Sequence, residues 1–145
     1  MAMENKNRND KGTAAVEFAL LLPLLLLMLF LMIEFSIAMY DKAVITNASR
    51  EGARRGILMQ DPRVTVPEIT AAVTAYSGTR LISFGAAPAA PTTTVSAACL
   101  PPPDGTGDLL TVTVSYQYNF FVLPKFLTTL TGPLIFNGIT VMRCE

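Results

Sequence analysis

The sequence lacks histidine and tryptophan, contains only two cysteines, and has 15% charged residues among its 145. Soluble domains usually contain about 25% charged residues, so charge is scarce here. Two cysteines without a histidine cannot supply the four ligands of an ordinary zinc site. The absence of histidine also removes the most common acid–base and nucleophilic mechanisms. We therefore expect a protein that is not an enzyme and that holds no metal and no cofactor.

The charges that are present balance, with eleven basic and eleven acidic side chains. Proteins that bind nucleic acid usually carry a basic surface, so a net charge of zero argues against that partner. The chain is long enough for one modest domain. Its unusual property is a hydrophobic fraction of 51%, which is concentrated in one segment.

That apolar segment lies near the N-terminus. Phe18 to Ile33 is a run of sixteen residues without a polar side chain, flanked by Glu17 and Glu34. A helix over residues 13–40 is long enough to cross a hydrocarbon core of about 30 Å. The single Pro23 is tolerated in such a helix as a kink. The segment therefore predicts one transmembrane helix, with Glu34 near the outer interface.

The flanking sequences divide the rest of the chain. Residues 1–12 are polar and resemble the basic region of an export signal. The helical pattern continues over residues 41–58 and stops before Asp61-Pro62. We therefore expect a leader peptide, a transmembrane helix, an extramembrane continuation of that helix, and a head domain over residues 59–145.

The head has the pattern of an α+β domain. Thr65 to Glu68 fits a capping box at the start of a short amphipathic helix, and Gly78 suits its C-terminal cap. Alternating apolar and polar side chains predict a strand over Leu109–Phe120. Further strands are predicted over Thr92–Cys99 and Ile139–Cys144. We expect one short helix and about three antiparallel strands, attached to the long helix.

Cys99 and Cys144 form a lone pair of cysteines in a small domain, a pattern that predicts a disulfide in an oxidising compartment. A bond closing this loop stabilises the folded state by about 4 kcal/mol on the chain-entropy model. It would also fix the C-terminus and place the head outside the cytoplasm. Two unpaired buried thiols are the alternative.

The junction between leader and apolar segment is the most informative motif. Lys11-Gly12-Thr13 ends a basic leader, and Glu17 follows five residues after the glycine. This arrangement resembles the class III signal of type IV pilins and pseudopilins, which a prepilin peptidase cuts after the glycine. The resemblance implies cleavage between Gly12 and Thr13. It also implies that Glu17 pairs with the free amine of Thr13 on a neighbouring subunit during assembly.

A longer series of residues is similar to the TadE-like family, the minor pseudopilins of tight-adherence (Flp) pilus systems. The series lies within residues 12–56 and comprises Ala14–Leu20, Leu22-Pro23-Leu24, Glu34-Phe35 and Asn47–Arg54. Phe18 stands where Flp-type sites often have tyrosine. The resemblance implies a single-pass protein of the inner membrane, with a cytoplasmic N-terminus and a periplasmic or extracellular head. Its implied partners are other pilin and pseudopilin subunits, the prepilin peptidase, the pilus assembly platform and the lipid bilayer.

The helix just beyond the membrane contains a charged motif interrupted by small residues. The motif consists of Asn47, Arg50, Glu51, Gly52 and Arg54. Its arginines suit lipid headgroups or acidic groups on a neighbouring subunit, and a solvated helix face is the simpler interpretation. A stripe of small residues on the same helix lets another backbone approach closely. The stripe consists of Ala48, Gly52 and Gly56. That backbone belongs to another pilin helix or, as we favour, to this protein's own sheet.

Two further segments of the head invite a functional interpretation. Asp104, Thr106 and Asp108 alternate in a Gly-rich turn, but Ser115 stands where a calcium loop needs Glu, so a plain turn is favoured. The apolar connection over residues 120–136 is expected to lie mostly under the sheet. Any exposed remainder would bind a partner.

These features lead to one functional hypothesis and three alternatives. We expect a minor pseudopilin that joins or primes a pilus through its helix, and so supports surface adhesion or secretion. The alternatives are an exported soluble protein cleaved after Ala38, a membrane-tethered binding module unrelated to pili, and an anchored enzyme. The mature N-terminus distinguishes the pseudopilin from the exported soluble protein, because prepilin-peptidase processing leaves Thr13 at the N-terminus and signal-peptidase processing leaves Met39.

Overall fold

The computed structural model describes residues 6–83, 90–96, 99, 108–120 and 134–144, with side chains from residue 12 onward. Within these residues there are two helices and three strands. They are α1 (Lys6–Gly56), α2 (Val66–Ser77), β1 (Thr92–Ser96), β2 (Leu109–Tyr118) and β3 (Leu134–Arg143). The predicted α+β class, with a long N-terminal helix, a short helix and an antiparallel sheet, is confirmed.

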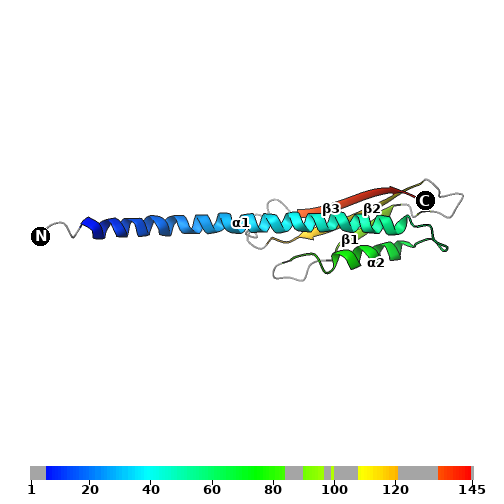
Figure 1. The fold of residues 1–145 in the computed structure, drawn as a ribbon, viewed down its shortest axis with the longest axis horizontal. Helices are drawn as coiled ribbons and strands as arrows, with labels where there is room; N and C mark the ends of the chain where they lie inside the picture. The colour runs from blue at the N-terminus through cyan, green and yellow to red at the C-terminus, as the bar shows by residue number, and fades with distance from the viewer. Residues whose placement is uncertain (1–5, 84–89, 97–98, 100–107, 121–133, 145) are drawn as a thin grey trace.

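Helix α1 runs without interruption into the head, and its N-terminal half stands alone (Figure 1). It begins at Lys6 rather than at the predicted Thr13, because no proline and no glycine before Gly12 opposes helix formation there. Pro23 is accommodated inside the helix. The helix ends at Gly56, two residues before the predicted end.

The three strands form one antiparallel sheet in the order β1-β2-β3. Every second side chain of the central strand β2 is buried, as its alternating sequence predicts. These side chains are Leu110, Val112, Val114, Tyr116 and Tyr118. Strand β2 ends at Tyr118 instead of Phe120, and β1 is described over the first five residues of its predicted range.

Strand β3 differs most from its prediction, since it begins at Leu134 and not at Ile139. The apolar sequence of the first residues hides the alternation, and Gly138 lowers their strand propensity. The glycine has a tertiary reason. A Cβ atom at Gly138 would lie 2.6 Å from the carbonyl oxygen of Ile45 in α1. Strand and helix therefore cross with their backbones in direct contact, and only glycine fits that crossing.

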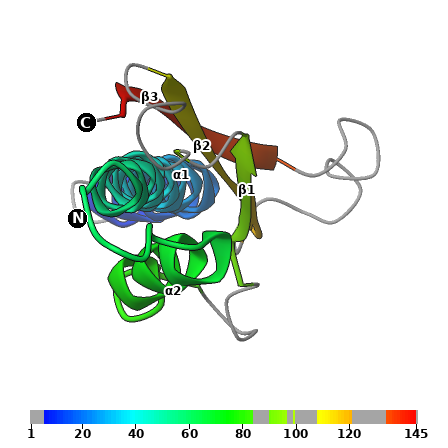
Figure 2. The ribbon, with the colours of Figure 1, turned by 90° about the vertical axis from the view of Figure 1, so that its right-hand side faces the viewer.

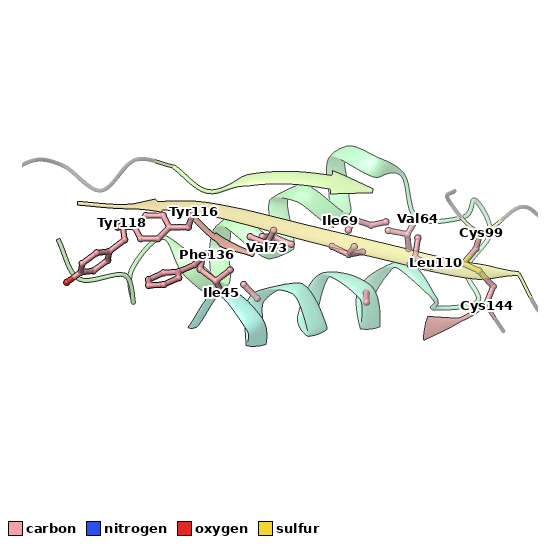
Figure 3. Packing of buried hydrophobic residues seen from close by; sticks show 14 of the residues in the cluster. Ile45, Val64, Ile69, Val73, Cys99, Leu110, Tyr116, Tyr118, Phe136 and Cys144 are labelled. Atoms are coloured by element: carbon pink, nitrogen blue, oxygen red, sulfur yellow. A yellow bond between two sulfur atoms is a disulfide. The ribbon is translucent and has the colours of Figure 1, made fainter. Parts of the chain in front are cut away.

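The head is built in two layers, with α1 and α2 side by side and the sheet covering them (Figure 2). Strands β2 and β3 pack on α1, and β1 lies toward α2. The core between the layers is elongated. Tyr116, Tyr118 and Phe136 lie at the end nearest the free half of α1, and the two cysteines lie at the opposite end (Figure 3).

Helix α2 begins where the sequence predicts its capping box. One carboxylate oxygen of Glu68 accepts hydrogen bonds from the backbone N–H of Thr65, at 2.7 Å, and from its hydroxyl, at 2.8 Å. Ile69 and Val73 on the next two turns are fully buried against α1 and the sheet. Local capping and apolar spacing together fix this helix in the head.

Candidate functional site

The free half of α1 presents an apolar surface without cover from the head. Every described side chain from Gly12 to Ile33 is exposed except Leu22, which is half-buried. By length and composition α1 is a candidate membrane span. Thr13 and Glu17 are exposed and lie four residues apart, on one face of the helix. Processing after Gly12 and assembly through Glu17 remain predictions.

The head begins to cover α1 at Glu34, inside the predicted membrane segment. Glu34 is only 4% exposed, and the Tyr118 hydroxyl donates a hydrogen bond of 3.5 Å to its backbone carbonyl. Two turns later Asp41 is fully buried. Its Oδ1 accepts a hydrogen bond of 3.0 Å from the backbone N–H of Ile82, and its Oδ2 has no hydrogen-bond partner among the described residues. Two carboxylates therefore face the core at the base of the head.

Burial at the base of the head shifts the pKa values of Asp41, Tyr116 and Tyr118. Burial raises the pKa of Asp41, and the hydrogen bond from Ile82 partly opposes that shift. Burial also raises the pKa of Tyr118 to about 12, with further contributions from the negative charges of Glu34 and Asp41. The pKa of Tyr116 is raised by burial and by Asp41. Both tyrosines therefore keep their hydroxyl protons at neutral pH and can act as hydrogen-bond donors.

The stripe of small residues on α1 packs inside the protein. A Cβ atom at Gly52 would lie 2.6 Å from the side chain of Val73 in α2, and one at Gly56 would lie 2.5 Å from Leu110 in β2. Ala48 is fully buried. Of the two partners predicted for this stripe, the protein's own sheet is observed, and helix α2 packs against the stripe beside it.

The charged motif divides between the two sides of α1. Arg50 and Arg54 are exposed on the side away from the sheet, together with Asn47. Arg50 donates to the Asn47 side chain at 3.3 Å. Arg54 forms a two-point ion pair with Glu51, at 2.9 and 3.2 Å, and its guanidinium lowers the pKa of the Glu51 carboxyl. The motif thus presents a polar face made of short-range pairs, while Gly52 faces the core.

An apolar groove of about 390 Å³ opens at the base of the head, where the free half of α1 meets the sheet. It is lined by Leu31, Glu34, Phe35, Ala38, Met39, Phe120, Leu134 and Phe136. On the head side, the rings of Phe120 and Phe136 line the groove. The Tyr118 ring packs against both, with centroid distances of 5.2 Å to Phe120 and 5.7 Å to Phe136. Almost all of the groove surface is apolar.

The opposite end of the head is closed by a disulfide between Cys99 and Cys144, with the two Cα atoms 5.8 Å apart. Figure 3 shows the bond beside Leu110 and Val64, at the far end of the core. The backbone N–H of Cys144 also donates to the carbonyl of Asp108 at 2.8 Å. The chain is therefore fixed to the sheet almost to its C-terminus, as the sequence predicts. In the described part of the chain, no three metal-ligating side chains gather into a group.

Sequence reasoning missed the buried stripe that precedes the small residues. The whole stripe advances in steps of three or four residues, the spacing of one helix face. It consists of Glu34, Ala38, Asp41, Ile45, Ala48, Gly52 and Gly56. The signal was present in the sequence, but two acidic members conceal it in a search for apolar residues. Of the other predicted contacts, Asp104, Thr106 and residues 121–133 lie outside the described residues.

Comparison with known proteins supports the resemblance for the long helix. Residues 12–54 match the family model described as TadE-like protein. The predicted resemblance to this family is therefore confirmed over that segment, and the match leaves most of the head outside it. No curated protein and no solved structure gives a match.

Proposed function

We propose that this chain is a minor pseudopilin of a tight-adherence pilus, anchored by α1 in the inner membrane with its head outside the cytoplasm. The observation that carries the proposal is the TadE-like match over residues 12–54, on a helix whose free half is apolar and exposed. The protein acts through assembly and has no catalytic role. Its partners are pilin and pseudopilin subunits, the prepilin peptidase and the assembly platform.

The boundary between the membrane part and the head favours a retained helix over a cleaved signal peptide. Cleavage after Ala38 would cut α1 within the stripe that the head covers, between the buried Glu34 and Asp41. It would also remove Leu31 and Phe35 from the groove. Cleavage between Gly12 and Thr13 leaves every packed residue of the helix in place.

The mature N-terminus tests the processing step. The full chain is expressed with a prepilin peptidase, and its mass and N-terminal sequence are determined. We expect Thr13 at the N-terminus, and a chain that keeps its leader when the peptidase is omitted. A mature chain that begins at Met39 would instead establish an exported soluble protein.

Replacement of Glu17 by Ala tests assembly. A carboxylate in the bilayer is costly, by about 2.5–3.5 kcal/mol on insertion scales, and is expected to have a partner there. We expect Glu17→Ala to insert normally but to be lost from pilus fractions. Val16→Ala, at the neighbouring exposed position, is the matched control and should assemble. Normal assembly of Glu17→Ala would contradict the proposed pairing with a subunit amine.

A further inference from the structure

The apolar groove at the base of the head lies at an unusual depth. Counting 1.5 Å per residue from Glu17, the helical side of the groove, Leu31 to Met39, lies about 21 to 33 Å along the axis. The hydrocarbon core of a bilayer is about 30 Å thick. If Glu17 marks the inner boundary, the groove therefore opens within the leaflet nearest the head. Any tilt of the helix brings it deeper.

The surface around the groove suits that depth. Leu31, Phe35 and Met39 are exposed at successive turns of α1, and they continue the apolar surface of the free half. From the head, Leu134 contributes a side chain that is 38% exposed, next to Phe136. The groove thus joins the lipid-facing side of the helix without a polar band between them.

Among the described residues that line the groove, Glu34 is the one with an ionisable side chain, and it is withdrawn from the opening. It is 4% exposed, and its backbone carbonyl accepts the hydrogen bond from Tyr118. A carboxylate at the edge of the hydrocarbon core needs such shielding. The lining offers no accessible charge to a soluble partner, whereas apolar walls fit a hydrocarbon chain.

We propose that the groove holds an acyl chain of a phospholipid in the head-side leaflet, so that the base of the head is embedded in that leaflet. The inference rests on the proposed membrane insertion of α1, and goes beyond it by placing part of the sheet domain in lipid. Leu134 and Phe136 then contact lipid, while the far end of β3 remains in water.

The absence of tryptophan from the sequence provides the test. Three full-length variants each carry one tryptophan: Leu134→Trp in the groove, Leu25→Trp on the free half of α1, and Ile139→Trp farther along β3. Ile139 is the matched control, because it is 62% exposed on the same strand and does not line the groove. Each variant is reconstituted in phosphatidylcholine vesicles with plain or brominated acyl chains, since bromine quenches tryptophan on contact.

We expect brominated chains to quench Leu25→Trp and Leu134→Trp, with most of the fluorescence lost, and to leave Ile139→Trp unchanged. Bromine near the carboxyl end of the chain should quench Leu134→Trp best, and bromine near the methyl end should quench Leu25→Trp best. Met39→Trp probes the same groove from α1, where the side chain is 47% exposed, and replaces Leu134→Trp if that variant does not fold.

The remaining outcomes separate this inference from the proposed function. Quenching of Leu25→Trp alone would overturn the lipid-filled groove and leave the membrane span intact. Quenching of all three would show a head lying flat on the bilayer, which also overturns a specific site. If none is quenched, α1 does not enter the membrane and the proposed anchor is wrong.

Discussion

The two halves of α1 use one secondary structure in opposite ways. From residue 13 to 33 nearly all side chains are exposed and apolar, and of these only Leu31 lines the groove with residues of the head. From residue 34 to 56 one face is buried under the head, and that face contains Glu34, Asp41 and two glycines. The outer face of this second half carries Arg50 and Arg54. Hydropathy thus identifies the first half and misleads about the second, where most positions of the buried face other than Ile45 are small or polar.

The difference has a physical origin. On the proposed insertion of α1 in a membrane, the first half needs only a surface that is soluble in lipid, so any large apolar side chain is suitable. The second half must fit a specific neighbour, and its positions are selected by available space, as at Gly52 and Gly56. Changes in the head should therefore alter its unfolding without changing the free half. The four predictions below test that separation.

Removal of the disulfide should have the largest effect. We expect Cys99→Ser with Cys144→Ser to lower the free energy of unfolding of the head by about 4 kcal/mol, because the unfolded chain gains the entropy of an open loop. The measurement is urea denaturation of the detergent-solubilised full chain, with and without reductant. Helicity of the free half should persist after the head unfolds. Loss of all helical signal in a single transition would show that the halves are not separate.

Gly138→Ala should come next. Its Cβ would meet the backbone of α1 at Ile45, which cannot move aside as a flexible side chain can. We expect a loss of about 3 kcal/mol in the free energy of unfolding, near the upper end of typical overpacking costs. Gly12→Ala is the matched control, since nothing lies within 4 Å of a Cβ there. Equal stability of the two variants would contradict the close crossing of α1 and β3.

Asp41→Asn should produce a smaller, pH-dependent change. Because the folded-state pKa of Asp41 lies above its ordinary value of 3.8, the folded protein binds this proton more tightly than the unfolded chain does. Its contribution to stability is therefore greatest below about pH 3.8 and decreases as pH rises through the raised pKa. The variant removes the buried charge and keeps an acceptor for Ile82. We expect it to be more stable than the parent by about 1 kcal/mol at pH 7.

The difference between Asp41→Asn and the parent chain should shrink as the pH falls toward 4. Unfolding of both proteins is measured in urea at intervals between pH 4 and 7. Tyr116 and Tyr118 stay protonated across this range, so they do not contribute to the change. A difference that grows toward low pH would have the wrong sign for a buried carboxylate.

The ion pair on the outer face should matter least for folding. Arg54 is exposed, Glu51 is partly exposed, and the two lie one turn apart, where solvent screens their attraction. We expect Arg54→Ala to leave the unfolding transition unchanged. The same variant, compared with Arg50→Ala in pilus pull-down, tests whether this face contacts a subunit. A clear loss of stability would mean that the pair supports the head.

Local sequence signals predicted most of the fold. The long helix, the cap formed by Thr65 and Glu68, and the alternation of β2 depend on neighbours a few residues apart. The disulfide followed from counting cysteines. Each of these features can be read without knowing what packs against it.

The features that sequence reasoning missed depend on contacts between distant segments. The early start of β3 is accommodated by Gly138, whose small size makes sense only against Ile45. Glu34 accepts its hydrogen bond from Tyr118, which lies 84 residues away in the sequence, and Asp41 accepts one from Ile82, which lies 41 residues away. The groove needs α1, β3 and Phe120 together.

If α1 is inserted in the bilayer as proposed, its continuity makes the molecule a stiff lever that pivots in the membrane. Gly56 lies 25 residues beyond Leu31, so the arm above the groove is about 38 Å long at 1.5 Å per residue. A rotation of about 10° at the membrane would swing its tip sideways by roughly 7 Å. Since β3 touches the helix backbone at Gly138, the sheet turns with the arm. In that arrangement, the tilt of α1 in the membrane determines the direction in which the disulfide end of the head points.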